Sequence, residues 1–478
     1  MQFKLFSISL LAVLFNFSEA QASSRMEQQS VARSEHKLAH RLDQELRQFF
    51  PANQAGATVL ILKDGKAVLN KAYGLANVEL QVPLKTNHLF HVASVGKQFT
   101  AAAILRLEEQ AKLKLDDPIT QYLTALPVAW SEIQVKHLLS HTSGIPNLFE
   151  DQQFRERAFL PHSPDQLLKL ASQQKLLAAA GTQFRYASIN YTLLAMIIEK
   201  TSGLSYAKFI EQEFLQILGM KNTVFDQTPG VIPNAVSPYQ AGPRVAEKFH
   251  PSVGFGGGSF YSTTADLARW TLALHAGKIL NHENTVRMHT PFVLRDGTAV
   301  HYGFGTRPHR LAGEAYLQSN GDIQGFHSET VYLPQSKLYV AILSNGESLP
   351  YGLVPVAKRL SVLASGKRAE ADKSFKPKQM QLSTTDLMKF VGIYKNGNEQ
   401  YQIHFKEGKL YLELSPNGPW NALTPLSARE FFYDSNTDFR MRFTEKENGQ
   451  HLAQWFEIDA LDDEVDPVFE RQVTKPLF

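Results

Sequence analysis

Alternating and periodic apolar positions divide this chain into strand-rich and helix-rich parts. Two apolar runs in residues 57–74 flank an Asp-Gly pair, which is the pattern of a β-hairpin. Helical periodicity dominates from residue 94 to about residue 218, and glycines predict helix ends at Gly203 and Gly277. Strand patterns return in residues 328–345. Strands on both sides of a helical segment predict an α+β domain with an antiparallel sheet.

The pattern changes near residue 365. Residues 369–381 are polar and charged and lack large aliphatic side chains before Met380, which predicts a linker. Beyond it, short segments alternate between apolar and polar residues, as in "YQIHFKEGKLYLEL" (401–414). We therefore predict a first domain over residues 23–368 and a small all-β barrel or sandwich over residues 382–478.

The first 22 residues have the organisation of a signal peptide. Lys4 precedes an apolar run from residue 5 to 17, and Ala20-Gln21-Ala22 resembles a cleavage site. The apolar run is short for a membrane span, so an uncleaved anchor is the alternative that we favour less. The sequence predicts a secreted protein, or one in the periplasm of a Gram-negative bacterium, without a stable membrane anchor after cleavage.

Composition narrows the classes of function. The 478 residues include 43% hydrophobic and 20% charged residues and carry a formal net charge of +3, as in ordinary soluble globular proteins. The sequence has no basic stripe of the kind that binds nucleic acid. Because the chain has no cysteine, disulfides and thiolate chemistry are excluded. The length predicts two domains.

A serine followed three residues later by a lysine is the main candidate for chemistry. In "HVASVGKQFTAAAIL" (91–105), Ser94 precedes an apolar helix and Lys97 lies about one turn further along. A buried lysine can accept a proton, and a helix N-terminus can stabilise an oxyanion. The alternative is that Ser94 is only an N-cap. The same spacing occurs in polar or amphipathic surroundings at Ser34…Lys37 and Ser205…Lys208, and we find no G-x-S-x-G motif.

A wider set of motifs accompanies Ser94 along the chain. The segments are "FHVASVGKQFTAAAILRLEEQAKLKLDDPI" (90–119), "VKHLLSHTSGIPN" (135–147), residues 180–223, "FGGGSFYSTTADLARW" (255–270) and "NGDIQGFHSETVYLP" (320–334). In these segments the chain resembles the serine β-lactamase-related family, which includes class C β-lactamases, D-alanyl-D-alanine carboxypeptidases and family VIII-type esterases. The part that follows the linker resembles the lipocalin-like β domain often attached to them. The resemblance implies a β-lactamase/penicillin-binding-protein-like fold.

The resemblance also implies the roles of individual residues. Ser94 would be the nucleophile that forms an acyl-enzyme, and Lys97 together with Tyr186 would be the general base. The oxyanion hole would use the backbone N–H groups of Ser94 and Asp322. Water would then release the acid product.

Two motifs depart from the family pattern. Ser188 stands where the Tyr-x-Asn motif has an amide, and we considered Asn190 as a substitute. The Lys/His-x-Gly motif begins with Ser319, so the usual cation is missing. These changes predict weak or no β-lactamase activity and favour an uncharged ester or peptide. The predicted substrate-binding residues are Ser188, Ser319, Asn320 and Gly321, with Arg307, His309 or Arg310 as other sources of positive charge.

The spacing of the histidines does not indicate a metal site. His141 and His327 are interpreted as structural, and none of the histidines shows the spacing of a metal motif, so we predict no metal and no cofactor. The hypothesis is an exported serine hydrolase acting on a small ester, a peptide or a D-amino-acid peptide. One alternative is a catalytically impaired binding or scaffold protein. Another is that the β domain carries the main ligand.

Overall fold

The structure is a computed structural model in which two compact units are distinguished. It describes residues 33–226, 230–240, 244–311, 313–347, 349, 352–366, 380–396, 399–413, 420–425, 427–433, 436–445, 451–457 and 468–471. The first unit runs to Pro308 and includes Tyr316–Gly366, whereas His309–Ala315 group with the residues from Lys367 onward. The predicted signal peptide, residues 1–22, and the predicted linker, except residues 380 and 381, lie outside the described residues.

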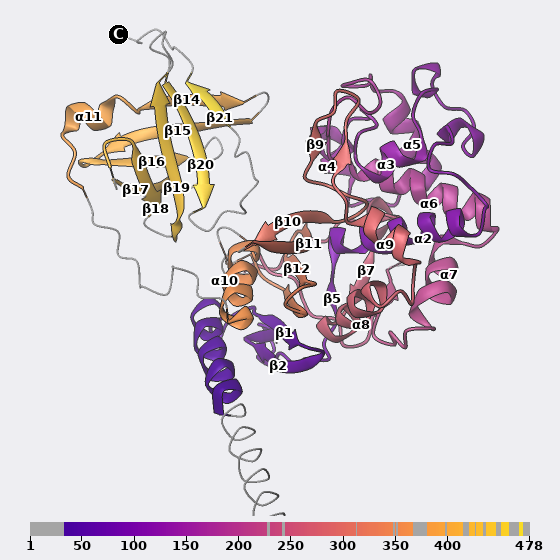
Figure 1. The fold of residues 1–478 in the computed structure, drawn as a ribbon, viewed down its shortest axis with the longest axis horizontal. Coiled ribbons are helices and arrows are strands. Elements are labelled where there is room, and N and C mark those ends of the chain that lie inside the picture. Colours follow the sequence, from indigo (N-terminus) through magenta and orange to yellow (C-terminus); the bar gives the residue numbers. More distant parts are fainter. Residues whose placement is uncertain are drawn as a thin grey trace, which may run out of the picture. The chain divides into compact units, whose positions relative to one another are not determined.

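An antiparallel sheet forms the centre of the first unit (Figure 1). Its strands follow the order β10 (Arg307–Leu311), β11 (Glu314–Ile323), β12 (Phe326–Leu333), β13 (Leu338–Ser344), β1 (Ala57–Lys63) and β2 (Lys66–Tyr73). Asp64 and Gly65 both have positive φ in the turn between β1 and β2. The predicted hairpin and the predicted α+β class are therefore confirmed.

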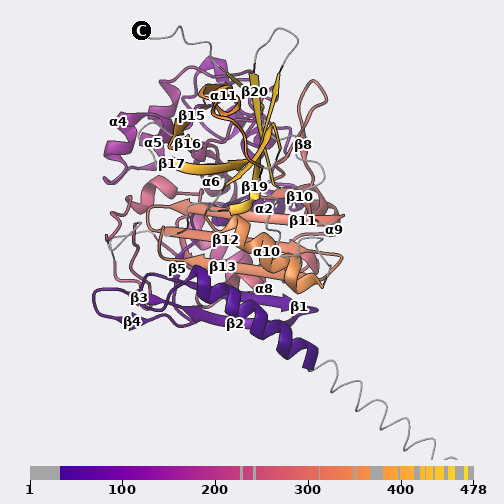
Figure 2. The same ribbon diagram turned by 90° about the vertical axis from the view of Figure 1, so that its left-hand side faces the viewer.

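Helices cover both faces of this sheet. Leu60, Tyr339 and Ala341 pack with Ala268 of α8 (Thr264–His275) on one face. Helix α10 (Val354–Ser365) packs on the opposite face, onto which Figure 2 looks. Burial on both faces explains why β13 is apolar without interruption.

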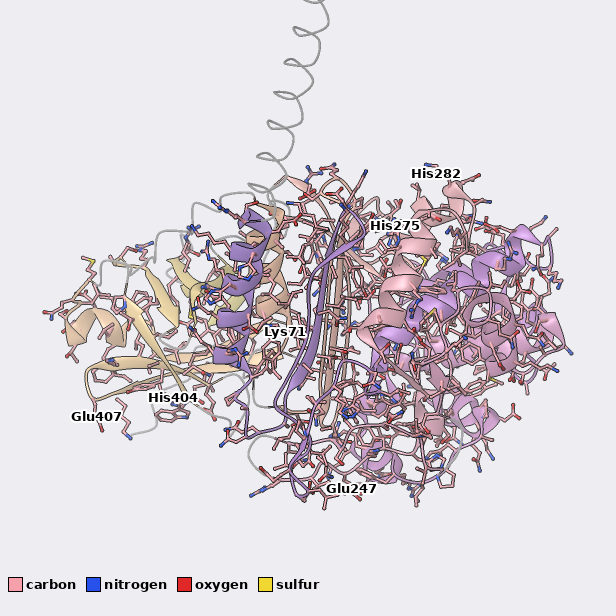
Figure 3. All side chains as sticks on the ribbon, turned by 90° about the horizontal axis from the view of Figure 1, so that it is seen from below. Lys71, Glu247, His275, His282, His404 and Glu407 are labelled. Atoms are coloured by element: carbon pink, nitrogen blue, oxygen red, sulfur yellow. The ribbon has the colours of Figure 1, made fainter. Side chains whose placement is uncertain are left out.

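Residues 33–49 form a helix that is tied to the edge of the sheet. The Asp43 carboxylate of this helix forms an ion pair with Lys71 of β2, at 3.0 Å, and accepts a hydrogen bond from Tyr73 at 2.9 Å (Lys71 is labelled in Figure 3). These side-chain contacts hold the first helix against β2.

The remaining helices and short strands of the first unit surround α2 (Lys97–Glu109), which is buried along most of its length. Helix α6 (Ser188–Ser202) packs on α2 and ends at Gly203, at φ +73°, as predicted. The other elements are β3 (Leu75–Asn77), β4 (Val82–Pro83), β5 (Phe90–His91), α3 (Val135–Leu139), α4 (Gln152–Arg157), α5 (Pro164–Ser172), α7 (Tyr206–Ile210), β6 (Val224–Phe225), β7 (Phe260–Ser262), α9 (His282–Met288), β8 (Phe292–Val293) and β9 (Ala299–Val300).

The second unit is all-β apart from one short helix among the described residues, so the predicted C-terminal β domain is confirmed. Consecutive strands pair antiparallel, and β14 also pairs with β21, which closes the sheet into a barrel. Its elements are α11 (Thr384–Met388), β14 (Gly392–Asn396), β15 (Glu399–Lys406), β16 (Lys409–Glu413), β17 (Trp420–Pro425), β18 (Glu430–Tyr433), β19 (Asn436–Glu445), β20 (His451–Glu457) and β21 (Val468–Arg471). Its lipocalin-like character stays a prediction. No helix in the described part of the chain is long and apolar enough to cross a membrane.

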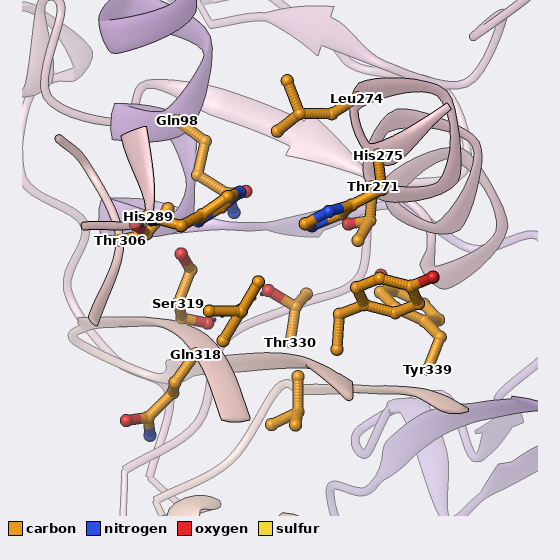
Figure 4. Close-up of a pocket in the computed structure, with 13 residues that line it drawn as sticks. Gln98, Thr271, Leu274, His275, His289, Thr306, Gln318, Ser319, Thr330 and Tyr339 are labelled. Carbon is orange, nitrogen blue, oxygen red and sulfur yellow. Dashed lines mark hydrogen bonds between the residues drawn. The ribbon is translucent and has the colours of Figure 1, made fainter. Parts of the chain in front are cut away.

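A small cavity of about 10 Å³ lies between the helices and β11 (Figure 4). The imidazoles of His275 and His289 line it and stack at 4.9 Å between ring centroids. His289 contacts the Thr306 hydroxyl through Nδ1, at 3.2 Å. Burial lowers the pKa of His275 to about 4 and that of His289 to about 3, the latter also because of its histidine neighbour. Both rings are therefore neutral at pH 7.

This pair predicts a loss of stability in mild acid. The native pKa values lie below the ordinary value of 6.5, so below pH 6.5 the unfolded chain binds more protons. The stability that depends on these two neutral histidines is fully present above pH 6.5 and is lost as the pH falls toward 4. We expect the free energy of unfolding to drop between pH 7 and pH 5, by roughly 1–2 kcal/mol for each histidine. Urea unfolding at both pH values will measure it.

His289→Gln, which cannot be charged, should remove about half of this pH dependence, because His275 still contributes. His282→Gln is the matched control, because His282 is exposed on the same helical segment (labelled in Figure 3). An unchanged pH dependence in His289→Gln would contradict the assignment of neutral, buried imidazoles.

Candidate active site

Ser94 lies in a strained turn at the start of α2. Residues Ala93–Gly96 form a 3-10 turn, and the α-helix begins only at Lys97. Ser94 makes no side-chain capping bond, so the alternative that it is merely an N-cap is wrong. Ala93 has φ +45°, which is the left-handed region that non-glycine residues avoid. The turn projects the half-buried Ser94 side chain into a cavity.

Lys97 and Tyr186 converge on the Ser94 hydroxyl. Lys97 Nζ donates to Ser94 Oγ at 3.0 Å and to the Gly257 carbonyl at 2.8 Å. Tyr186 OH donates to the same Oγ at 2.8 Å. Lys97 is 2% exposed, and no carboxylate lies within ion-pair distance of Nζ in the described part of the chain. Ser94 therefore has two groups at hydrogen-bond distance that can exchange protons with it.

Strand β11 passes close to the Ser94 backbone. A Cβ atom on Gly321 would lie 2.4 Å from the Val92 carbonyl oxygen and 2.7 Å from Ser94 N, so only glycine fits there. Ser328 Oγ donates to the same Val92 carbonyl at 2.7 Å. Asp322 follows on β11 and lines the cavity together with Ser94. This approach places the two backbone segments that were predicted to form the oxyanion hole side by side.

The cavity at Ser94 has a volume of about 220 Å³. Its lining combines Ser94, strand β11 and the segment that enters β10. The residues that line it are Ser94, Tyr186, Tyr302, Gly305, Thr306, Arg307, Ser319, Asn320, Gly321 and Asp322. The predicted residues Ser319, Asn320 and Gly321 are therefore at the cavity, whereas Ser188 is not among the residues that line it.

Arg307 is the one arginine on this lining. Its guanidinium carbon lies 5.5 Å from the centre of the Tyr302 ring, a cation–π contact. It forms no ion pair with any carboxylate that the structure describes. Of the other proposed cations, His309 and Arg310 do not line the cavity, and Arg310 donates to the Gly313 carbonyl at 2.8 Å.

The two departures from the family motifs have structural counterparts. Ser319 Oγ donates to the Gly305 carbonyl at 3.3 Å, so this hydroxyl is used inside the protein. Asn190 is fully buried and accepts a hydrogen bond from Ser143 at 2.8 Å, so the suggestion that it replaces the missing amide is wrong. Asn147 Oδ1 instead accepts from the Ser188 amide at 3.4 Å. No sequence spacing links residues 147 and 188, which is why Asn147 was missed.

The ring of His141 packs against the ring of Tyr186. Its Nδ1 accepts a hydrogen bond from Ala187 N at 3.2 Å, and its ring lies 4.2 Å from the Tyr186 ring. Burial, and secondly the charge of Lys97, lower the pKa of His141 well below 6.5. The ring is neutral, as a structural role requires. His327 hydrogen-bonds the Asp322 carboxylate, and no cluster of potential metal ligands occurs among the residues described.

Comparisons with known proteins bear on the family and the fold of this chain. The family model named Beta-lactamase matches residues 42–362. A penicillin-binding protein of Bacillus subtilis (strain 168) is 26% identical over 388 residues, which are 76% of this chain and 84% of that protein. An octameric penicillin-binding protein homologue from Pyrococcus abyssi has TM-score 0.65 at 23% identity, covering 90% of this chain and 99% of its own.

A D-amino acid amidase from Ochrobactrum anthropi shares the fold as well. Its TM-score is 0.60 at 20% identity, and the match covers 70% of this chain and 100% of the amidase. At this level of identity the two structural likenesses establish the fold alone. They agree with the mixed helices and antiparallel sheet described above.

The Ser94 geometry predicts that the Tyr186 hydroxyl is required for reactivity. Tyr186→Phe removes the group 2.8 Å from Oγ and should slow covalent labelling of Ser94 by a fluorophosphonate. The expected loss is about 10²- to 10⁴-fold, the usual contribution of general acid–base catalysis. Tyr191→Phe is the control, because its hydroxyl donates to the Leu139 carbonyl and not to Ser94. Equal labelling rates in both variants would contradict the role of Tyr186.

Proposed function

This chain belongs to the beta-lactamase family, and we propose that it hydrolyses small esters or amides through an acyl-enzyme at Ser94. Members of the family are serine hydrolases. The observation that carries the proposal is the convergence of Lys97 Nζ and Tyr186 OH on Ser94 Oγ, at 3.0 and 2.8 Å. A binding or scaffold protein would have no need of a buried lysine at this hydroxyl, so this geometry favours the enzyme.

The reaction follows from these contacts. Once Lys97 or Tyr186 has given up a proton, it can accept the Ser94 proton as Oγ attacks the substrate carbonyl carbon. The negative oxygen that forms would accept hydrogen bonds from Ser94 N and Asp322 N. The pair then returns the proton to the leaving alcohol or amine, the bond to the leaving group breaks, and the acyl group stays on Oγ. Water repeats these steps and releases the acid.

The cavity favours a substrate with a negative group near the scissile bond. Arg307 lines the cavity without an ion pair among the described residues, and a guanidinium can hold a carboxylate through paired hydrogen bonds. We therefore prefer a peptide or amide with a free carboxylate to the uncharged substrate that the sequence favoured. The names of the penicillin-binding protein and the D-amino acid amidase support D-amino-acid compounds as a first set of substrates.

Weak or absent β-lactamase activity and export remain part of the proposal. The first rests on the replacement of the motif cation by Ser319, whose hydroxyl is bonded within the protein. The second rests on the signal-like sequence of residues 1–22. Secretion can be tested by sequencing the N-terminus of the mature protein from the culture medium or periplasm.

The decisive experiment is intact-mass analysis after treatment with a fluorophosphonate probe. We expect a single adduct on the wild-type protein and none on Ser94→Ala, because only Ser94 has the Lys97 and Tyr186 contacts. Circular dichroism of both proteins controls for folding. If folded wild-type protein forms no adduct, or Ser94→Ala still forms it, the hydrolase proposal is rejected.

Arg307→Gln tests the substrate class. For a peptide with a free C-terminal carboxylate, KM should rise roughly 10- to 100-fold, as expected for the loss of a charge-assisted hydrogen bond of about 1.5–3 kcal/mol. For the methyl ester of the same peptide, KM should change little. Arg310→Gln is the matched control, because Arg310 is exposed and does not line the cavity. Equal effects of Arg307→Gln on both substrates would show that Arg307 does not bind the carboxylate.

A further inference from the structure

The turn that carries Ser94 is unusual for its sequence. Ala93 has φ +45° although it is not a glycine. Its carbonyl oxygen faces Gly258 so closely that a Cβ atom on Gly258 would lie 1.9 Å away. A residue held in this backbone region costs of order 1–3 kcal/mol and persists only when its surroundings fix it. Contacts around Ala93 must therefore stabilise this backbone conformation.

His91 makes the contact that does so. Its Nδ1 accepts a hydrogen bond from the Ala93 N–H at 3.1 Å, two residues along the chain. The His91 side chain is 8% exposed. Its ring packs edge-on against Tyr261, at 5.2 Å between centroids, and against Phe326 at 6.0 Å. Strand pairing of His91 with Tyr261 between β5 and β7 fixes the imidazole in place.

We propose that His91 is a positioning residue for the nucleophile. By holding the Ala93 N–H, it keeps the turn in the conformation that aims Ser94 N at the oxyanion site beside Gly321 and Ser94 Oγ at Lys97 and Tyr186. This inference rests on the proposed function of Ser94. His91 does not touch the reacting atoms and is not a catalytic residue.

The surroundings keep His91 in the form that this role needs. An accepting Nδ1 requires a neutral imidazole with its proton on Nε2. Burial, and secondly the charge of Lys248, lower the pKa of His91 to about 4. Lys248 Nζ lies 3.2 Å from the Tyr261 hydroxyl, and Asp226 is the carboxylate that interacts with Lys248. Tyr261 thus contacts both the His91 ring and Lys248 Nζ.

Two substitutions separate the hydrogen bond from the packing. His91→Asn keeps an acceptor, because asparagine Oδ1 can bond a backbone N–H two residues further on, as in an Asx turn. His91→Phe keeps a ring against Tyr261 and Phe326 but has no acceptor. It leaves the buried Ala93 N–H without a partner. The first variant thus keeps the hydrogen bond without the ring, and the second keeps the ring without the hydrogen bond.

The test measures fluorophosphonate labelling of Ser94 and, for a cleavable ester, kcat and KM. We expect His91→Phe to lower the labelling rate and kcat about 100-fold with little change in KM, since a small misplacement of reacting groups can have this effect. His91→Asn should stay within a few-fold of wild type. Thermal unfolding of each variant is compared with wild type, and if His91→Phe does not fold, His91→Leu serves as the apolar variant without an acceptor.

Two outcomes overturn the inference. If His91→Phe reacts like wild type, the hydrogen bond to Ala93 does not position Ser94. If His91→Asn is impaired as strongly as His91→Phe, only the packing of the ring matters. Failure of the proposed function itself is distinguishable, because then wild-type protein also fails to label.

Discussion

The active site depends on an approach between backbone segments that leaves no room for a side chain. A Cβ atom on Gly258 would lie 1.9 Å from the Ala93 oxygen, and one on Gly321 would lie 2.7 Å from Ser94 N. Because the chain near Gly258 touches the turn, the Gly257 carbonyl reaches Lys97 Nζ at 2.8 Å. Because β11 touches it from the other side, the backbone after Gly321 lies beside Ser94 N. The sheet and the helical region thus define the site by packing against the same turn from two sides.

The same close packing determines which charged and neutral groups surround Lys97. Lys97 is buried, with a hydroxyl and a carbonyl as hydrogen-bond partners. His141, whose pKa is lowered by burial and secondly by the charge of Lys97, is neutral. Glu329 on β12 is fully buried, and this burial raises the pKa of its carboxyl well above 4.5, which favours its neutral form. The two charged side chains on the cavity lining are Arg307 and Asp322, and the Asp322 carboxylate is hydrogen-bonded to His327.

Local sequence signals predicted the parts of the fold that local interactions decide. The Asp64–Gly65 hairpin, the end of α6 at Gly203 and the barrel strands followed from turn residues and apolar periodicity. Ser94 and Lys97 could be paired because they lie within one turn. Tyr186 needed the family resemblance, since 92 residues separate it from Ser94. Asn147 and the strain at Ala93 could not be predicted, because each depends on contacts between segments that are distant in sequence.

In the proposed function, Arg307 takes the role of the cation that the β11 motif lacks. The motif position on β11 holds Ser319, whose hydroxyl bonds the Gly305 carbonyl. Arg307 lies on the neighbouring strand, β10, and its guanidinium rests over the Tyr302 ring. An ammonium is a compact, strongly hydrated charge, whereas a guanidinium is planar, stacks on aromatic rings and binds a carboxylate with two bonds. A guanidinium that enters the cavity from β10 would therefore bind an anionic substrate from another direction than a cation on β11.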